Sequence, residues 1–491
     1  MSDPRARPRH RRQPPRGQRP RSAPTDPARE AAFDVLAAIR EKDAYTNLVL
    51  PPLLRSRGIT GRDAAFTTEL VSGTVRRQGT YDAVVAACVD RPLAKVDPGV
   101  LDALRLGTHQ LLSMRVPSHA AVGSTVDLVR RKVGHGPAGF VNAVLRRVAR
   151  KDLAAWLHEA APDPASDPVG YAVVATSHPR WVVEALAEAL HGGDPDADHT
   201  TARPGAGETS RPGELQRLLE ADNEAPLVTL AARPGLSTVE ELVAAGGVLS
   251  ELSPYAVRLQ GGDPGAVPAV AEGRAGVQDE GSQLVALALA AARVMTADDR
   301  WLDLCAGPGG KAALLAALAG RQGARLLANE RQEHRARLVA SATARSGVGL
   351  LATVTADGTR PAWPDASFDR VLVDAPCSGL GALRRRPESR WRRTPADLEG
   401  LVALQRALLG TALDSVRPGG VVAYVTCSPV LAETSGVVAA VLAGRSDVRL
   451  EDAAPLFPGV HDAAGPLAGT VQLWPHRHGT DAMFLALLRR A

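Results

Sequence analysis

The sequence predicts a multidomain protein that combines an N-terminal all-α bundle, a small α+β subdomain and a C-terminal α/β domain. Its 491 residues are enough for about two to four domains with cores of their own. Apolar residues recur at helical spacing through residues 28–150. From Arg300 onward, apolar strands alternate with helices, which is typical of a parallel sheet that helices cover on both faces.

Composition and charge are those of an ordinary globular protein with a basic tail. Hydrophobic residues make up 45% of the chain and charged residues 23%. The formal net charge is +5, but residues 1–25 hold eight arginines and one acid, so the remaining chain is slightly acidic. We expect this Arg/Pro-rich tail to be disordered, either without a specific role or loosely attracted to phosphates. Net charge therefore does not decide whether the protein binds nucleic acid.

The cellular compartment follows from apolar runs and cysteines. No apolar run approaches the roughly 18 residues of a membrane helix, and the N-terminus lacks the apolar core of a signal peptide. The four cysteines, Cys88, Cys305, Cys377 and Cys427, show no C-x-x-C spacing. This argues against a zinc site or a disulfide framework. We expect a cytoplasmic protein with free thiols, no metal and no membrane contact.

Residues 26–151 are predicted to form the all-α bundle. Ala32, Leu36 and Ile39 fall on one helix face, and Gly or Pro turns separate the later helices. Arg146 and Arg147 belong either to an ordinary helix surface or to an RNA-contacting face. The run Phe140–Arg147 resembles the NusB-like RNA-binding domain.

The middle of the chain predicts a linker and a small subdomain. Residues 152–175 contain Asp163-Pro164 and Asp167-Pro168, which are typical of linkers. Residues 176–275 predict an α+β subdomain, with a low-complexity insert at 191–212 that we expect to be unstructured. Its predicted elements are a helix at Trp181–Leu190, a strand at Leu227–Leu230 and a helix at Thr238–Ala245.

Residues 276–491 predict a doubly wound sheet. The expected strands are Trp301–Leu304, Leu326–Asn329, Leu351–Val354, Arg370–Val373 and Val421–Val425, and the expected helices are Lys311–Leu318, Glu333–Ala344, Pro395–Ser415 and Ala432–Leu442. The third helix has a clear start, with Thr394 as N-cap, Pro395 at the first position and Asp397 at the third. Val471–Leu473 and Asp481–Leu488 predict a terminal antiparallel hairpin. A sheet of this kind with such a hairpin is the Rossmann-like methyltransferase variant of the fold.

The loop from Asp303 to Lys311 predicts a nucleotide-type cofactor site, because its glycines let the backbone approach a ligand in front of a helix N-terminus. It lacks the first glycine and the hydroxyl of a P-loop, and its glycines do not fit G-x-G-x-x-G. S-adenosylmethionine fits better, since Glu330 and Asp357 follow the next two strands, where ribose hydroxyls and the adenine amine bind. Both acids also suit ordinary strand-end loops.

Two cysteines, Cys377 and Cys427, follow the ends of two apolar strands, beside this cofactor loop. A thiolate that adds to C6 of cytosine makes C5 reactive enough to accept a methyl group. Asp374, three residues before Cys377, is placed to offset charge that develops at N3. Each cysteine alone also fits a small buried hydrophobe. The residues by themselves do not show which cysteine attacks.

The motifs Asp374–Gly379 and Thr426–Pro429 resemble those of RNA cytosine-C5 methyltransferases, and the cofactor loop matches the same family. A NusB-like domain ahead of this catalytic domain is similar to the Sun-type 16S rRNA enzymes. The resemblance implies that Cys427 attacks and that Cys377 assists release. It also implies the following cofactor-binding residues: Cys305, Ala306, Gly307, Pro308, Gly309, Gly310, Lys311, Glu330, Asp357 and Asp374. The chain departs from the family pattern at the insert, at Leu431–Thr434 and at Ala482.

A basic segment follows Cys377 and suits RNA. Its candidate phosphate-holding and base-stacking residues are Arg384, Arg385, Arg386, Arg390 and Trp391. The same segment also fits a charged loop with one anchoring tryptophan. We predict a monomeric methyltransferase that acts on RNA, with 16S rRNA as the expected substrate. The alternatives are a tRNA or DNA substrate, or a non-catalytic RNA-binding ribosome assembly factor.

Overall fold

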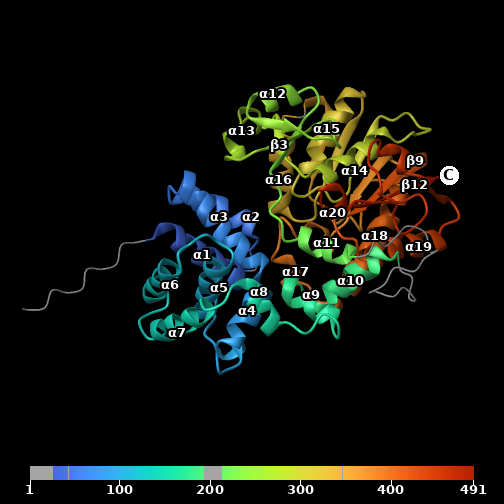
Figure 1. Ribbon diagram of the computed structural model, residues 1–491. Coiled ribbons are helices and arrows are strands. Elements are labelled where there is room, and N and C mark those ends of the chain that lie inside the picture. Colours follow the sequence, from blue (N-terminus) through green and yellow to red (C-terminus); the bar gives the residue numbers. More distant parts are fainter. Residues whose placement is uncertain (1–25, 43, 193–212, 346) are drawn as a thin grey trace, which may run out of the picture.

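The computed structural model describes residues 26–42, 44–192, 213–345 and 347–491. The predicted tail 1–25 and residues 193–212 of the predicted insert lie outside this part of the chain. Figure 1 shows a blue-to-cyan helical body, a green segment beside it and a yellow-to-red body built on a sheet. The predicted combination of an all-α bundle, a small α+β region and an α/β sheet is confirmed.

The N-terminal body is a bundle with one apolar core. Its helices are α1 Pro27–Lys42, α2 Thr46–Ser56, α3 Gly61–Arg76, α4 Gln78–Ala87, α5 Pro98–Leu112, α6 Ser118–Lys132, α7 Ala138–Val148 and α8 Leu153–Ala160. Ala32 and Leu36, one turn apart on α1, are both buried in this core. Asp97 begins α5 by accepting a hydrogen bond from the Val100 amide at 3.0 Å, so one free amide of the first turn is satisfied.

Residues 152–175, where the sequence predicts a linker, carry two helices instead. They are α8 and α9, Pro168–Thr176. The Asp–Pro pair at 167–168 starts a helix here, because the Asp167 side chain accepts a hydrogen bond from the Gly170 amide and Pro168 takes the first helical position. Trp156 of α8 is buried in the bundle core, which ties this segment to the N-terminal body.

A small sheet and two further helices follow. Helices α10 Arg180–Leu190 and α11 Glu214–Ala221 pack with Leu383 and Trp474 of the C-terminal body in one apolar cluster. The sheet has the order β2-β3-β1-β4 and is antiparallel throughout. Its elements are β1 Thr229–Ala232, α12 Val239–Ala244, β2 Gly247–Leu249, β3 Ala256–Leu259, α13 Pro268–Ala271 and β4 Ala275–Val277.

The large sheet has the strand order β10-β12-β9-β8-β5-β6-β7, with β11 paired to β12. Strands β5 to β9 run parallel, and β12 runs antiparallel to β9 and to β10. The strands are β5 Arg300–Asp303, β6 Arg325–Asn329, β7 Leu350–Val354, β8 Phe368–Asp374, β9 Val416–Thr426, β10 Val448–Glu451, β11 Val471–Gln472 and β12 Phe484–Arg490. The predicted terminal hairpin is confirmed as β11 and β12, whereas β10 was not predicted.

Helices cover both faces of this sheet. They are α14 Glu280–Ala291, α15 Gly310–Arg321, α16 Glu333–Thr343, α18 Pro395–Ser415 and α19 Ser435–Ala443. Two short helices, α17 Ser389–Arg392 and α20 Pro475–His478, lie in the connections from β8 to α18 and from β11 to β12. Side chains of α14, α15 and α16 share one apolar cluster with the sheet, and those of α18 and α19 share another. The predicted capping box of Thr394 and Asp397 is present at the start of α18. None of the helices in the described residues is long and apolar enough to cross a membrane.

The strand order reverses between β5 and β8. The chain passes from β5 outward to β6 and β7, then returns to β8 and β9 on the other side of β5. Loops diverge above such a switch point, and ligands of doubly wound sheets bind in the resulting crevice at the carboxyl ends of the strands. The cofactor loop and both cysteine loops leave the sheet at this edge.

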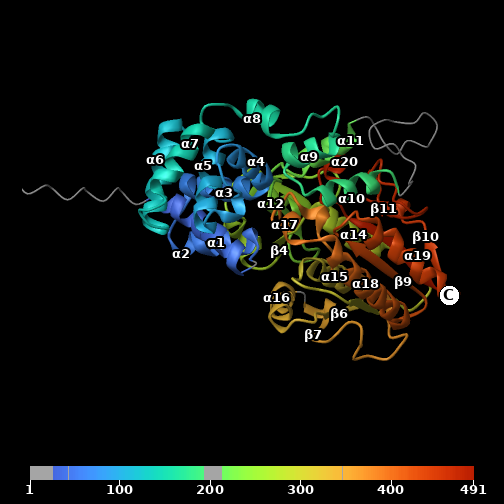
Figure 2. The same ribbon diagram turned by 90° about the horizontal axis from the view of Figure 1, so that it is seen from below.

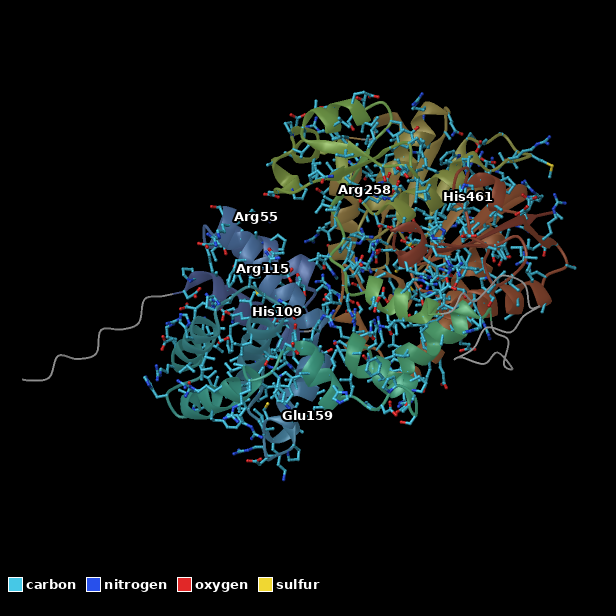
Figure 3. All side chains as sticks on the ribbon, in the orientation of Figure 1. Arg55, His109, Arg115, Glu159, Arg258 and His461 are labelled. Carbon is cyan, nitrogen blue, oxygen red and sulfur yellow. The ribbon has the colours of Figure 1, made fainter. Side chains whose placement is uncertain are left out.

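The helical bundle docks beside this crevice, next to α17 (Figure 2). The Thr46 amide and hydroxyl, at the start of α2, donate hydrogen bonds to the Glu388 carboxylate at 3.0 and 3.1 Å. The Tyr45 ring lies against the guanidinium groups of Arg386 and Arg392. In Figure 3, the labelled side chains Arg55, His109 and Arg115 mark the bundle, whereas Arg258 and His461 mark the other body. The bundle therefore contacts the segment that follows Cys377.

Candidate active site

The glycines in the loop between β5 and α15 let the loop backbone pack closely against neighbouring side chains. Gly309 adopts φ +113°, and a Cβ there would lie 2.7 Å from the Ala342 side chain. A Cβ on Gly307 would lie 2.0 Å from Glu330 Oε2. Cys305 is half-buried and Ala306 is buried, while the N-terminal turn of α15 begins at Gly310. The loop amides and this helix N-terminus form a surface suited to a polar ligand.

The two predicted cofactor acids follow β6 and β7, as expected. Glu330 is 5% exposed, and its Oε2 accepts a hydrogen bond from the Gly307 amide at 3.1 Å. Asp357 is half-buried, and its Oδ1 accepts hydrogen bonds from the Thr359 amide and hydroxyl at 3.0 and 2.8 Å. Those hydrogen bonds lower the pKa of Asp357. The structure thus places Glu330 in direct contact with the cofactor loop.

Asp303, the last residue of β5, was not predicted as a site residue. It is fully buried, and its Oδ1 accepts a hydrogen bond from the Cys305 amide at 3.3 Å. Its other oxygen has no hydrogen-bond partner within the described part of the chain. Burial and the nearby charge of Asp374 raise the pKa of Asp303 to about 8. Its place before the Cys-Ala-Gly-Pro-Gly-Gly turn was the one signal available in the sequence.

Lys311 links the cofactor loop to the cysteine site. Its Nζ lies 2.9 Å from Asp374 Oδ2. Burial alone would lower the pKa of Lys311, but the charge of Asp374 and the hydrogen bond to it outweigh burial, so the pKa is raised. The pair therefore holds a positive and a negative group where β5 and β8 meet.

The two predicted cysteines come together. Cys377 Sγ and Cys427 Sγ lie 3.4 Å apart, each half-buried, in the loops that follow the neighbouring strands β8 and β9. The hydrogen bond from Cys377 lowers the pKa of Cys427, and the charges of Arg386 and Lys311 lower it further against the effect of burial. The same hydrogen bond, burial and the acid Glu433 raise the pKa of Cys377. These shifts favour the thiolate form at Cys427 over that at Cys377.

Glu433 is a second residue that the sequence did not mark. It lies in the stretch where the chain departs from the family pattern, and its side chain is fully buried. Its carboxylate accepts hydrogen bonds from Ser378 and Ser428, the residues that directly follow the two cysteines. An acid within seven residues of a strand-end cysteine was the available signal.

Two of the predicted RNA-binding arginines are buried, and this contradicts the prediction for them. Arg390 has no exposed surface, and Arg384 is 7% exposed. Arg384 donates to the Gly479 carbonyl at 2.7 Å, and Arg390 donates to acceptors of α3 and of the segments beside α9 and α11. Burial lowers the pKa of Arg390 to about 10, so it stays charged at neutral pH. Arg390 therefore joins the catalytic body to the bundle and to the segments beside α9 and α11, whereas the Arg384 side chain bonds within the catalytic body. The sequence revealed neither role.

The other predicted RNA-binding residues differ in accessibility. Arg385 lies in ion pairs with Asp279 and Asp481. Arg386 is half-buried beside Tyr45.

Trp391 packs against Gly79, where a Cβ would lie 2.6 Å from its ring, so it anchors α17 to the bundle. Arg146 and Arg147 are exposed on α7 and available to a partner. Of this set, Arg385, Arg386 and Trp391 are partly exposed and the α7 pair is exposed.

The fold and the crevice define a class of protein. The sheet has a path of seven strands with one antiparallel strand, a glycine loop follows β5, and acids follow β6 and β7. Rossmann-like methyltransferases that use S-adenosylmethionine have this arrangement. The described residues around Asp303, Glu330 and the start of α15 fit such a group, because they offer amides, carboxylates and an unpaired buried oxygen.

Comparisons with known proteins identify the family. The model described as 16S rRNA methyltransferase RsmB/F matches residues 291–489, and the NusB family model matches residues 26–150. A putative methyltransferase of Mycobacterium tuberculosis is 53% identical, over 97% of this chain and 99% of its own length. A probable ribosomal RNA small subunit methyltransferase B of Bacillus subtilis is 30% identical, over 94% of this chain and 98% of its own. The chain belongs to the 16S rRNA methyltransferase RsmB/F family, which confirms the resemblance.

Solved structures share the fold. The crystal structure of PH0851 matches with a TM-score of 0.74 at 21% identity, over 96% of this chain and 100% of that one. NSun6 from Pyrococcus horikoshii, solved with SFG, an analogue of S-adenosylmethionine, matches with a TM-score of 0.50 at 18% identity. That match covers 64% of this chain and 98% of the other. This chain is a methyltransferase that depends on S-adenosylmethionine.

Proposed function

We propose that this protein methylates C5 of a cytosine in 16S rRNA and that Cys427 bonds covalently to C6 of that base. The observation that carries the proposal is the thiol pair, 3.4 Å apart, beside the Lys311–Asp374 ion pair. Thiols in this position suit a ring whose carbon must first be activated. The relatives' names, which specify the ribosomal RNA small subunit, support rRNA as the substrate.

The chain's own residues divide the work. The Cys427 thiolate forms a bond to C6, and the C5=C6 electron pair moves into the ring, so C5 becomes nucleophilic. A proton shared between the Asp374 carboxyl group and N3 balances the negative charge that thiolate addition places on the ring, and Lys311 holds Asp374 in position. Bound S-adenosylmethionine supplies the electrophilic methyl group. Solvent then takes the C5 proton, the electron pair of that C–H bond re-forms C5=C6, and the bond between C6 and sulfur breaks to leave the Cys427 thiolate. Cys377, in contact with Cys427, assists this release.

The substrate is tested by incubating the purified full chain with labelled S-adenosylmethionine and, separately, 16S rRNA, tRNA or DNA. We expect label in 16S rRNA, at C5 of cytosine after nuclease digestion. Label in tRNA or DNA alone would overturn the rRNA assignment. Absence of transfer to every nucleic acid, with RNA still bound, would favour a non-catalytic assembly factor instead.

The cysteine roles are tested with two variants and a control. We expect Cys427→Ala to abolish methylation and to form no covalent adduct. Cys377→Ala is expected to accumulate a protein–RNA complex that survives denaturing electrophoresis, because the bond to C6 forms but is released slowly. Cys88→Ala, in the core of the bundle, controls for loss of a thiol. An adduct that accumulates with Cys427→Ala would reverse the assignment.

A further inference from the structure

Glu433 joins the two cysteine loops through one buried carboxylate. Its Oε1 accepts hydrogen bonds from the Ser378 amide at 2.7 Å and from Gln405 Nε2 at 3.1 Å. Its Oε2 accepts from the Ser378 hydroxyl at 2.5 Å and from the Ser428 hydroxyl at 2.6 Å. Ser378 follows Cys377 in the chain, and Ser428 follows Cys427. One carboxylate therefore contacts the residue next to each thiol.

The surroundings hold Glu433 itself in place. Its backbone carbonyl accepts a hydrogen bond from the Tyr424 hydroxyl of β9 at 2.7 Å. Gln405 of α18 donates to both the Glu433 carboxylate and the Pro376 carbonyl, at 3.1 and 2.8 Å. The carboxylate thus connects β9, α18 and the loop after β8. Charge-assisted hydrogen bonds in a buried site are short and resist rearrangement, so such a network fixes the loops that it joins.

The network also places a negative charge near the thiol pair. The Glu433 carboxylate accepts two hydrogen bonds from Ser378, next to Cys377, and one from Ser428, and its charge contributes to raising the pKa of Cys377. At Cys427 the acid Asp374 raises the pKa, and the cations Arg386 and Lys311 lower it. The charged groups around the two thiols therefore differ although the sulfurs are 3.4 Å apart.

We propose that Glu433 is a positioning residue that clamps the two cysteine loops at contact distance and places its negative charge beside the Cys377 loop. The inference rests on the proposed function and deepens it, since it names the group that holds the attacking and the releasing thiol together. Glu433 acts through the cysteine loops and not on the base or the cofactor, because both oxygens of its carboxylate accept hydrogen bonds from Ser378, Ser428 and Gln405.

The charge is tested without RNA or cofactor, so that the outcome is independent of the proposed function. In a Cys427→Ala background, alkylation of Cys377 by iodoacetamide is followed against pH by peptide mass spectrometry, with Glu433 or with Glu433→Gln. The glutamine keeps the shape, and the serine hydroxyls can reverse their hydrogen bonds to it. We expect the midpoint for Cys377 to fall by about one pH unit. Alkylation near pH 7 should become about threefold faster, because a less basic thiolate is also a weaker nucleophile.

Glu280→Gln is the matched control. Glu280 is also a buried glutamate that accepts hydrogen bonds from serine and backbone donors, but it contacts residues of the small sheet region instead of the cysteine loops. We expect this variant to leave the Cys377 alkylation profile unchanged. A profile that Glu433→Gln does not move, or that Glu280→Gln moves equally, would overturn the proposed effect of the charge.

The clamp is tested by the rate at which diamide, a two-electron thiol oxidant, converts Cys377 and Cys427 into a disulfide. Each thiol loses a proton and the azo group takes the two electrons, so the rate reports how often the sulfurs meet. We expect the loss of single hydrogen bonds in Ser378→Ala and Ser428→Ala to slow the reaction. Glu433→Ala removes every link that runs through the carboxylate and should slow the reaction by about tenfold. The serine variants keep the test decisive where Glu433→Ala fails to fold. An unchanged rate in all folded variants would overturn the clamp.

Discussion

Replacing Arg390 with methionine should loosen the joint between the helical bundle and the catalytic body. The Arg390 guanidinium is fully buried and donates four hydrogen bonds. Nη1 donates to the carbonyl oxygens of Arg76 and Ser177, at 3.3 and 3.1 Å, and to the side chain of Asn223 at 2.9 Å. Nη2 donates to the Asp222 carbonyl at 3.2 Å. Methionine fills similar space but leaves all four acceptors without this partner.

The expected loss follows from those contacts. A buried acceptor that loses its partner costs about 1 kcal/mol or more, and removal of one member of a buried charged network costs about 3–5 kcal/mol. We therefore expect Arg390→Met to reduce the free energy of unfolding by about 3–5 kcal/mol. For a cooperative unit of this size that corresponds to a fall in Tm of roughly 6–20 °C. Arg146→Met, on the exposed surface of α7, should change stability by no more than about 0.5 kcal/mol.

Two measurements on both variants show whether Arg390 serves packing or contacts RNA. They are scanning calorimetry and RNA affinity at fixed salt. The structural role requires that Arg390→Met lowers the temperature of the first unfolding transition while Arg146→Met does not. A Tm within about 2 °C of the original protein, together with weaker RNA binding, would refute the reasoning and restore the RNA-contact prediction. Limited proteolysis between the bundle and the catalytic body offers a second check, since a loosened joint exposes the segments around α8 and α9 to cleavage.

Two further predictions concern the site. The pKa of Asp303 is raised from 3.8 to about 8, so the stability that its protonated form provides is complete below about pH 4 and is lost as pH rises through about 8. Asp303→Asn should therefore flatten this part of the profile of Tm against pH. An equal slope in both proteins would contradict the raised pKa of Asp303. Gly381→Ala should cost about 1–3 kcal/mol and most of the activity, because its Cβ would lie 2.2 Å from the Ala482 carbonyl and 2.8 Å from that of Cys427. Gly400→Ala is the control, because Gly400 lies on α18 with open space around it, and it should stabilise the protein by up to about 1 kcal/mol in denaturant unfolding. Equal losses of stability in Gly381→Ala and Gly400→Ala would refute the steric argument.

Local patterns predicted the catalytic sheet well. The predicted helix Pro395–Ser415 and its capping box match the structure, and the predicted strands at Leu326–Asn329 and Leu351–Val354 differ from β6 and β7 by one residue. Periodicity and capping act between neighbours in the chain, so they are visible in the sequence. The helix predicted at Ala432 begins instead at Ser435, because Glu433 turns inward to the cysteine loops before the helix starts.

A few adjacent residues were enough to predict the chemistry of the site: a glycine loop, acids after successive strands and two strand-end thiols. The use of the charged groups, in contrast, depends on the tertiary structure. A run such as Arg384–Arg390 has the same composition whether water or protein surrounds it, and the fold buries two of its arginines. Likewise, the contact between thiols 50 residues apart and the link through Glu433 depend on strands and loops that meet only in the folded chain. Burial and long-range contact set these electrostatics, and neither is a property of local sequence.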